Sequence, residues 1–246
     1  MKILVCISKA PDTTTKISFT DDNTKFNEDK VQFIVNPYDE WYALVRGLEL
    51  KEAAGGTVTI VTAGGADHDP IIRKALAIGA DNAVRIDTDP KDGYSAAKEI
   101  AAYAEGKDYD LILLGKETIN YNGSQVGGMI AEFLGMPYVS VASKLDVDGG
   151  NATVEQDMPG GKQVMQGPLP LVISCAKGMA EQRIPNMRGI MAARTKPLEV
   201  VPPSGAEPLV TAKKFSLPAE KGDVKLIDAD NIEELVELLH NEAKVI

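Results

Sequence analysis

The clearest structural signal in this sequence is the run Leu111-Ile112-Leu113-Leu114-Gly115-Lys116, which continues through a polar loop into residues 125–134. Its four consecutive aliphatic residues follow Asp108-Tyr109-Asp110 and predict a β-strand that is buried on both faces. Residues 125–134 have a helical pattern, which Gly135 and Pro137 bring to an end. A buried strand that leads into a helix is the repeating unit of a parallel α/β sheet.

The same unit recurs on the N-terminal side of this run. The expected strands are Ile3–Ile7, Thr57–Thr62 and Ala83–Ile86, and the expected helices are Pro37–Ala54, Pro70–Ile78 and Gly93–Glu105. This alternation predicts a parallel, doubly wound sheet with helices on both faces, which binds ligands outside the carboxyl ends of its strands. The loops after Ile7, Thr62 and Leu114 are therefore the expected site.

The pattern changes after residue 140. Lys144–Asp148 and Ala152–Gln156 flank Gly149-Gly150, which predicts a β-hairpin inserted into the α/β fold, and Leu171–Ala176 predicts another core strand. We therefore expect an α/β domain over residues 1–198.

Residues 199–246 have a different composition. Prolines recur up to Pro218, and an apolar stripe of helical period begins at Ile232, behind the expected cap Asp230. Such a segment buries little on its own chain, so it is either a loose tail or an arm that wraps a partner.

Composition excludes several classes of function. The chain has 246 residues, a formal net charge of −10 and a sequence pI near 4.8, which argues against nucleic-acid binding. It contains no apolar run of about 18 residues, and its N-terminal apolar run is too short for a signal peptide, so a cytoplasmic location is expected. Cys6 and Cys175 lie in apolar runs and predict core residues, and the two histidines have no neighbouring cluster for a metal or a catalytic triad.

Two further segments allow both a functional and a structural interpretation. The loop from Gly115 to Gly128 has small residues where it enters a helix, which suits a phosphate but also suits a tight strand-to-helix turn. Residues 181–197 combine apolar residues with four cations and have no acid between Gln182 and Leu198. That segment fits either a surface that docks another protein or a solvated basic turn.

Residues 181–197 closely resemble the signature of the electron transfer flavoprotein β subunit, whose usual form is close to E-P-R-Y-P-S-L-R-G-I-M-A-A-K-K-K-P. The loop after Leu114 is similar to the family's G-K-x-x-I-D-x-D-x-x-Q-V-G segment, with matches at Gly115, Lys116, Ile119, Gln125, Val126 and Gly127. Residues 36–40 match its N-P-x-x-E, and residues 61–81 match its V-x-x-G and R-x-A-L-A-M-G-A-D elements. The resemblance covers nearly the whole chain. It departs at Asn120 and Asn122, where acids are common, and at Ser8-Lys9, which replaces Lys-Gln.

The resemblance implies a universal-stress-like, adenine-nucleotide-binding sheet. It implies FAD shared with an α subunit, structural AMP, and a C-terminal arm that wraps that α subunit. The residues that it places at the cofactors are Cys6, Asn36, Tyr38, Ala63, Asn122, Gly123, Ser124, Gln125, Val126 and Gly127. It also implies that Met179–Ile184 docks partner dehydrogenases, with Met179 as an apolar anchor beside Glu181, Arg183 and Ile184.

The implied function is that of an electron carrier subunit without catalytic residues or a metal of its own. The heterodimer accepts electrons from acyl-CoA and related dehydrogenases, as in fatty acid β-oxidation, and passes them to a membrane quinone oxidoreductase. One alternative within the family is an electron-bifurcating protein, in which a second FAD replaces AMP. A more distant alternative is a stand-alone nucleotide-binding regulator of the universal-stress type, which lacks residues 181–197 and the long tail.

Overall fold

A computed structural model describes residues 1–37, 39–118, 122–220 and 222–246. The chain divides into two units. The first, called here the α/β unit, comprises Met1–Lys16 and Asn27–Lys213, and the second comprises Ile17–Phe26 and Lys214–Ile246. The prolines after residue 201 therefore lie partly within the α/β unit, and the two units are described separately below.

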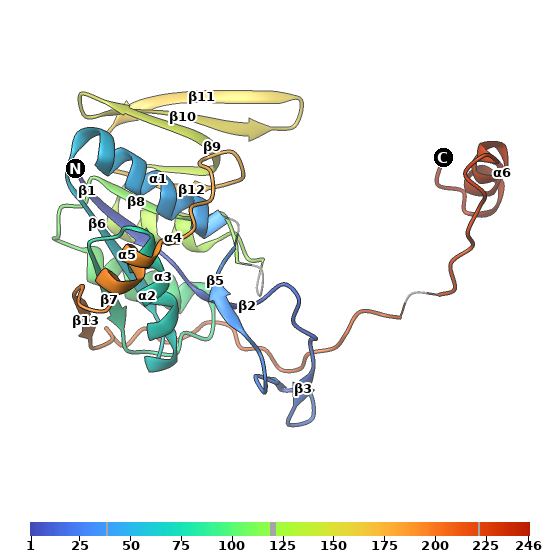
Figure 1. Ribbon diagram of the computed structural model, residues 1–246, viewed down its shortest axis with the longest axis horizontal. Helices are drawn as coiled ribbons and strands as arrows, with labels where there is room; N and C mark the ends of the chain where they lie inside the picture. The colour runs from blue at the N-terminus through green and yellow to red at the C-terminus, as the bar shows by residue number, and fades with distance from the viewer. Residues whose placement is uncertain (38, 119–121, 221) are drawn as a thin grey trace. The chain divides into compact units, whose positions relative to one another are not determined.

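The α/β unit is built on a nine-stranded, mostly parallel sheet in the order β11-β10-β9-β12-β8-β1-β6-β7-β13 (Figure 1). Its strands are β1 (Lys2–Cys6), β6 (Thr57–Ala63), β7 (Asn82–Ile86), β8 (Leu111–Gly115), β9 (Tyr138–Asp148), β10 (Asn151–Met158), β11 (Gly161–Pro168), β12 (Leu171–Cys175) and β13 (Leu198–Val201). The parallel strands expected from the sequence are all present. The expected hairpin is present as well: β9 pairs antiparallel with β10 around Gly149-Gly150, and β11 extends it.

One edge strand was not expected. Leu198–Val201 forms β13 and pairs in parallel with β7, so the residues around the expected boundary at 198 belong to the sheet. Four residues are too short a run to show a strand period, and the prolines that follow Val201 end the strand. The chain therefore leaves the sheet after Val201.

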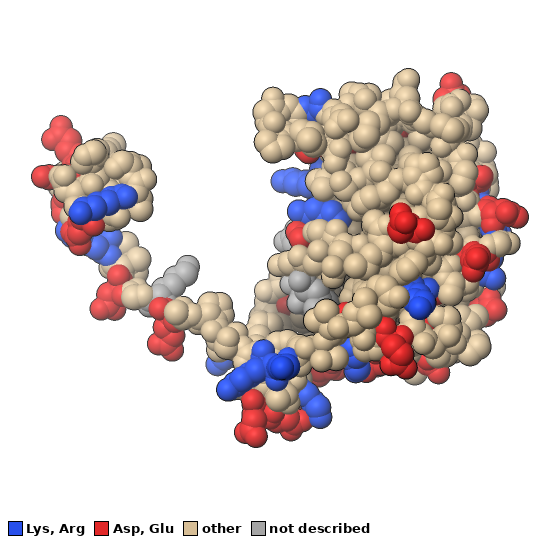
Figure 2. All heavy atoms as spheres, turned by 180° about the vertical axis from the view of Figure 1, so that it is seen from behind, with Lys and Arg blue, Asp and Glu red and all other residues tan. Residues whose placement is uncertain are grey.

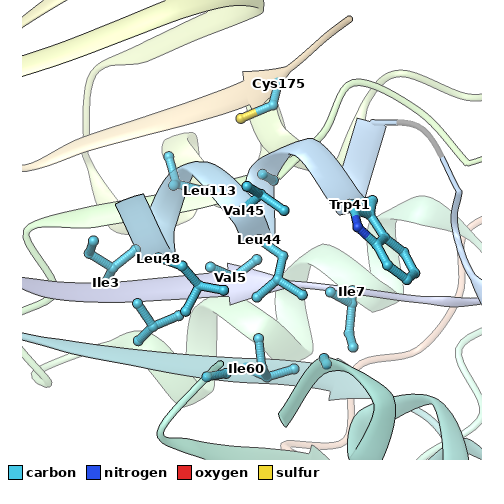
Figure 3. Close-up of a cluster of buried hydrophobic side chains, with 14 of the residues drawn as sticks. Ile3, Val5, Ile7, Trp41, Leu44, Val45, Leu48, Ile60, Leu113 and Cys175 are labelled. Carbon is cyan, nitrogen blue, oxygen red and sulfur yellow. The ribbon is translucent and has the colours of Figure 1, made fainter. Parts of the chain in front are cut away.

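Helices cover both faces of the sheet, as a doubly wound fold requires. Helices α1 (Asp39–Ala54) and α2 (Asp69–Ile78) pack on one face, against strand residues such as Ile3 and Val5. Helices α3 (Gly93–Ala104) and α4 (Val126–Leu134) pack on the other, against residues such as Leu4. Figure 3 shows side chains of α1 and the strands meeting in the first of these two core layers. Alternate residues of β1 thus enter opposite layers, which explains the uninterrupted apolar run.

The surface of the α/β unit carries charges of both signs (Figure 2). On the face of the α/β unit drawn in Figure 2, acidic and basic side chains form small groups separated by uncharged surface. Within the described ranges, no helix combines the length and the apolar character needed to cross a membrane.

The second unit joins a short hairpin to the C-terminal residues. Strands β3 (Phe19–Thr20) and β4 (Lys25–Phe26) form the hairpin, and the Phe215 ring stacks on Phe19 with 5.4 Å between ring centroids. Helix α6 (Ile232–Glu237) confirms the expected C-terminal helix, and residues Leu238–Glu242 continue it. Its cap is Asn231, whose side chain accepts from the N–H of Glu234, and not Asp230 as expected. Its apolar side chains at Ile232 and Val236 are exposed in this unit.

Candidate functional site

The structure brings the three expected site loops together at one edge of the sheet. Strands β8, β1 and β6 are neighbours and run in parallel, so their carboxyl ends meet. Cys6 ends β1 and Ala63 ends β6, while Gly115 ends β8. Cys6 is buried in the second core layer, and burial raises the pKa of its thiol, so the uncharged thiol is the form that the site contains.

Asn36 lies just before α1 and connects it to the loop after β8. Its side chain is 1% exposed, and Nδ2 donates a hydrogen bond to the Glu117 carbonyl over 2.8 Å. This bond fixes the orientation of the amide, because a carbonyl oxygen can only accept. The other amide atom, Oδ1, is buried and has no hydrogen-bond partner among the described residues. Asn36 therefore presents an unused acceptor, whereas a helix cap would have used it. The neighbouring Tyr38, expected at the flavin, lies outside the described residues.

The buried carboxyl group of Glu40 stabilises this edge of the sheet. Glu40 accepts hydrogen bonds from the backbone N–H and the hydroxyl of Ser8, both at 2.7 Å. Burial raises the pKa of Glu40 to about 7, although both Ser8 bonds act in the opposite direction. Ser8, where this chain departs from the family pattern, thus joins the end of β1 to the start of α1. The displaced Lys9 makes ion pairs with Asp67 and Glu28.

Gly115 is needed because β8 and α1 approach closely here. A Cβ atom at Gly115 would lie 2.9 Å from the backbone nitrogen and the Cγ of Glu40. Any side chain would therefore push the end of the strand away from the start of the helix. The sequence matched this glycine to a family motif, and the structure gives its physical reason.

A cavity of about 320 Å³ opens beside these groups, which is near the lower end of the range of ligand sites. It is lined by Asn36, Asp39, Tyr42, Lys116, Glu117, Asn122 and Lys177. Lys116 and Lys177 supply positive charge, Asp39 and Glu117 supply two carboxyl groups, and the Glu117 Oε1 lies 3.1 Å from the Lys116 Nζ. Tyr42 and Lys177 were not found from the sequence, because neither lies in the loops that the strand pattern singles out.

The expected phosphate loop contributes to this cavity only in part. Asn122 lines the cavity and has a φ of 47°, a left-handed conformation that asparagine tolerates. Ser124 also has a positive φ, of 50°, and its hydroxyl donates to the Glu117 carboxylate over 3.1 Å. Gly123 and Gln125 are exposed. Residues 119–121 lie outside the described residues.

The last two predicted loop residues belong to α4. Val126 is partly buried against the second core layer. Gly127 faces the Tyr138 ring, where a Cβ would lie 2.9 Å from a ring carbon. Packing on β9 is therefore sufficient reason for Gly127 to be glycine.

The loop after β6 is held by an arginine that the sequence did not single out. Arg85 is 6% exposed, and its Nη1 donates to the carbonyl of Gly64 over 3.0 Å, directly after Ala63. Its charge is balanced by Asp87 and by Asp69, whose Oδ1 lies 2.9 Å from the Arg85 Nε. Those two atoms are not aligned for a hydrogen bond, so this contact is an ion pair only. Arg85 thereby fixes the turn that follows β6.

The basic segment 181–197 forms a short helix, α5 (Met187–Ala193), fixed on α2. Asn186 caps α5 by accepting from the N–H of Gly189 over 2.8 Å. Gly189 lies against α2 so closely that a Cβ would be 2.2 Å from the Ala77 carbonyl oxygen. At the C-terminal end of α5, cationic side chains bind the backbone carbonyls. Arg73 donates to the carbonyls of Ala193 and Lys196 at 2.8 and 2.7 Å.

Lys196 completes the attachment from the other side. Its Nζ donates to the Leu76 carbonyl, at the end of α2, over 2.9 Å. Each helix therefore receives a cation at its carboxyl end from the other element. The base of the segment is therefore attached to α2, while the side chains on its outer face remain exposed.

The outer face of this segment is apolar and basic. Ile184 is 87% exposed and Met187 is 75% exposed, and Ile190 and Met191 are exposed beside them. Arg188 is exposed as well, and so is Glu181. These exposed apolar side chains and Arg188 are called here the docking surface.

Two of the residues expected to dock partners are placed differently. Met179 is only 4% exposed and packs in the first core layer, so the expectation that it is an exposed anchor is wrong. Met187, which the sequence analysis did not select, is the exposed methionine. Arg183 makes a two-bond contact with the Glu52 carboxylate of α1, at 2.7 and 2.9 Å. Its charge is therefore largely satisfied within the chain.

Comparison with known proteins places this arrangement in a family. Residues 23–206 match the family model for the electron transfer flavoprotein domain. The chain is 38% identical to the electron transfer flavoprotein subunit beta of Bacillus subtilis (strain 168), and the alignment covers 100% of both chains. It is 36% identical to the subunit beta of Syntrophomonas wolfei over 100% of this chain and 98% of that one. The human subunit beta is 31% identical over 87% of this chain and 86% of its own. The chain belongs to the electron transfer flavoprotein β-subunit family.

Membership of the electron transfer flavoprotein family makes the chain a subunit of an electron carrier, and it implies an α subunit as partner. In the described part of the chain, no three histidine, cysteine or carboxylate side chains gather as a metal ion would require. The polar groups at the sheet edge are instead arranged as hydrogen-bond partners and charges around a cavity.

Proposed function

We propose that this chain pairs with an electron transfer flavoprotein α subunit and that the cavity beside Asn36 binds AMP. In this proposal FAD, held mainly by the α subunit, accepts electrons from acyl-CoA-type dehydrogenases and delivers them to a membrane quinone oxidoreductase. The flavin supplies the redox chemistry when it is bound. The residues of this chain bind the nucleotide, exclude water from the sheet edge and present the docking surface.

The unused acceptor of Asn36 carries the nucleotide part of the proposal. The Asn36 Oδ1 has no hydrogen-bond partner among the described residues, and a buried acceptor left without one costs about 1–3 kcal/mol, which favours a donor supplied by a ligand. An adenine amino group or a ribose hydroxyl is such a donor. Lys116 and Lys177 line the same cavity and suit a phosphate.

The nucleotide content of the purified heterodimer tests this proposal. The chain is co-expressed with its α subunit, the complex is denatured, and the released nucleotides are identified by chromatography and mass. One FAD and one AMP per heterodimer are expected. Two FAD molecules would replace the proposal by the bifurcating alternative, and a chain that never acquires an α subunit or a flavin would contradict it altogether.

The docking surface supports the second part of the proposal. Ile184 and Met187 are too exposed to stabilise the fold, and they lie on a base that is fixed to α1 and α2. Exposed apolar side chains beside cations suit a partner that offers an apolar pocket with an acidic rim. Flexible methionines suit a surface that meets several dehydrogenases.

A further inference from the structure

Two carboxylates of α3 hold the chain after it leaves the sheet. Glu99 is 2% exposed and accepts three backbone hydrogen bonds from consecutive residues. The donors are the N–H groups of Ser204, Gly205 and Ala206, at 2.6, 3.0 and 2.8 Å. One carboxylate thus binds the N–H groups of three consecutive residues, and these bonds lower the pKa of Glu99.

Asp92 binds the same segment further along. Its Oδ1 caps α3 by accepting from the N–H of Ser95 at 2.8 Å. Its other oxygen, Oδ2, accepts from the N–H groups of Leu209 and Val210 at 2.7 and 2.9 Å. The two carboxylates together, called here the α3 clamp, therefore accept five backbone bonds from residues 204–210. Bonds to a charged acceptor are stronger than bonds between neutral groups.

The clamp holds the backbone while two large apolar side chains remain outside. Leu209 is 71% exposed and Val210 is 67% exposed, although the backbone N–H of each is bound. A loose segment would lose conformational entropy on meeting a partner, whereas a segment that is already fixed loses less. The exposed apolar residues continue along the chain at Leu217 and Val224. Such a sequence of exposed apolar residues indicates a protein partner.

We propose that Glu99 and Asp92 are positioning residues that fix residues 204–210 so that Leu209 and Val210 are presented to the α subunit. The identity of this partner rests on the proposed function, because membership of a β-subunit family implies an α subunit. The clamp lies wholly within the α/β unit and ends shortly before Lys214, where the second unit resumes.

Matched substitutions separate the clamp from other roles of these carboxylates. Glu99→Gln leaves one acceptor oxygen and replaces the other with an amide NH2 group. That group cannot accept a hydrogen bond from a backbone N–H. Asp92→Asn keeps an acceptor for the helix cap, because asparagine is an equally good cap, and removes the acceptor for Leu209 and Val210. Glu105→Gln and Asp89→Asn are the controls, because they remove the same charge near α3 without contacting residues 204–210 in the described hydrogen bonds.

Amide hydrogen exchange of the full-length chain is the first measurement. Glu99→Gln is expected to speed exchange at 204–206 by at least tenfold, and Asp92→Asn at 209–210, while the controls remain at the wild-type rate. The amides of β8 report whether the variant is folded. Unchanged exchange at residues 204–210 in a folded Glu99→Gln chain would overturn the clamp.

Affinity for the α subunit is the second measurement. The Glu99→Gln, Asp92→Asn double variant is expected to bind the α subunit about tenfold more weakly. Leu209→Ala with Val210→Ala is expected to weaken binding without changing exchange at 204–206. Wild-type affinity in the double variant, despite faster exchange, would overturn the positioning role. A wild-type chain that binds no α subunit would instead refute the proposed function, and the exchange result would still decide whether the clamp exists.

Discussion

The edge of the sheet and the docking surface are built in opposite ways. At the sheet edge the unsatisfied group is polar and buried: the Asn36 Oδ1 has no partner among the described residues. At the docking surface the unsatisfied groups are apolar and exposed, as Ile184 and Met187 show. A small polar ligand can satisfy the buried polar group at the sheet edge, and another protein can cover the exposed apolar side chains of the docking surface. The type of group that a surface leaves unsatisfied therefore indicates the type of partner that binds there.

Met179 gives the largest expected effect, because it separates core from surface. Met179→Ala is expected to lower the free energy of unfolding by about 2–5 kcal/mol, since it leaves a cavity in a packed core. Denaturant unfolding of the full chain measures it. An effect below 0.5 kcal/mol, as for an ordinary surface substitution, would contradict the burial of Met179 in the core.

The pH dependence of the free energy of unfolding tests the burial of the Glu40 carboxyl at the sheet edge. Its pKa in the folded chain is about 7 and its ordinary value is 4.5, so the folded chain binds more protons between these values. The free energy of unfolding therefore falls as pH rises from about 4.5 to 7, by at most roughly 3 kcal/mol from this group. Glu40→Gln, which mimics the neutral carboxyl toward Ser8, is expected to lose that contribution. Parallel pH profiles for the variant and the wild type would contradict the burial of a carboxyl with a raised pKa.

Gly115 and Gly123 form a matched pair in the loop after β8. Gly115→Ala places a methyl group 2.9 Å from Glu40, which is expected to cost about 1–3 kcal/mol of stability and to weaken nucleotide retention. At Gly123 the nearest atom to a Cβ is 3.5 Å away, so Gly123→Ala is expected to change either quantity far less. Thermal unfolding and nucleotide content measure the two effects. Equal effects at both positions would mean that the close approach of β8 to α1 is unimportant.

The docking surface gives the smallest expected effect. Met187→Ala and Ile184→Ala are expected to leave stability within about 0.5 kcal/mol of wild type. Each is expected to weaken the productive encounter with a dehydrogenase by roughly 1–2 kcal/mol if it is a central anchor. The KM for the carrier in dehydrogenase-driven reduction measures this, with Ile17→Ala, which lies outside the docking surface, as control. An unchanged KM in both variants would refute the docking role.

Local patterns were sufficient to predict most of the fold. Uninterrupted aliphatic runs such as Leu111–Leu114 predicted strands buried on both faces, and the glycine pair at 149 and 150 predicted the hairpin. The pattern failed where an element is too short to show a period, as in β13, and where two polar residues compete for a cap, as at Asp230 and Asn231.

The candidate site was predictable only as far as its loops. Family motifs led to Asn36 and Gly115, but the contacts that fix them join distant parts of the chain. Ser8 reaches Glu40 across 32 positions, and Arg183 reaches Glu52 across 131. No local pattern records such pairs. The burial of Met179 depends in the same way on the core that folds over it, and the family resemblance that suggested an anchor there does not record that burial.

Binding of AMP to the nucleotide-free heterodimer tests the central claim most directly. The wild type is compared by calorimetric titration with Asn36→Ala, which removes the unused acceptor together with the Nδ2 bond to the Glu117 carbonyl, and the FAD content is measured in parallel. The AMP dissociation constant is expected to be at least tenfold higher in the variant, with the FAD content unchanged. An Asn36→Ala heterodimer that binds AMP as tightly as the wild type would contradict it.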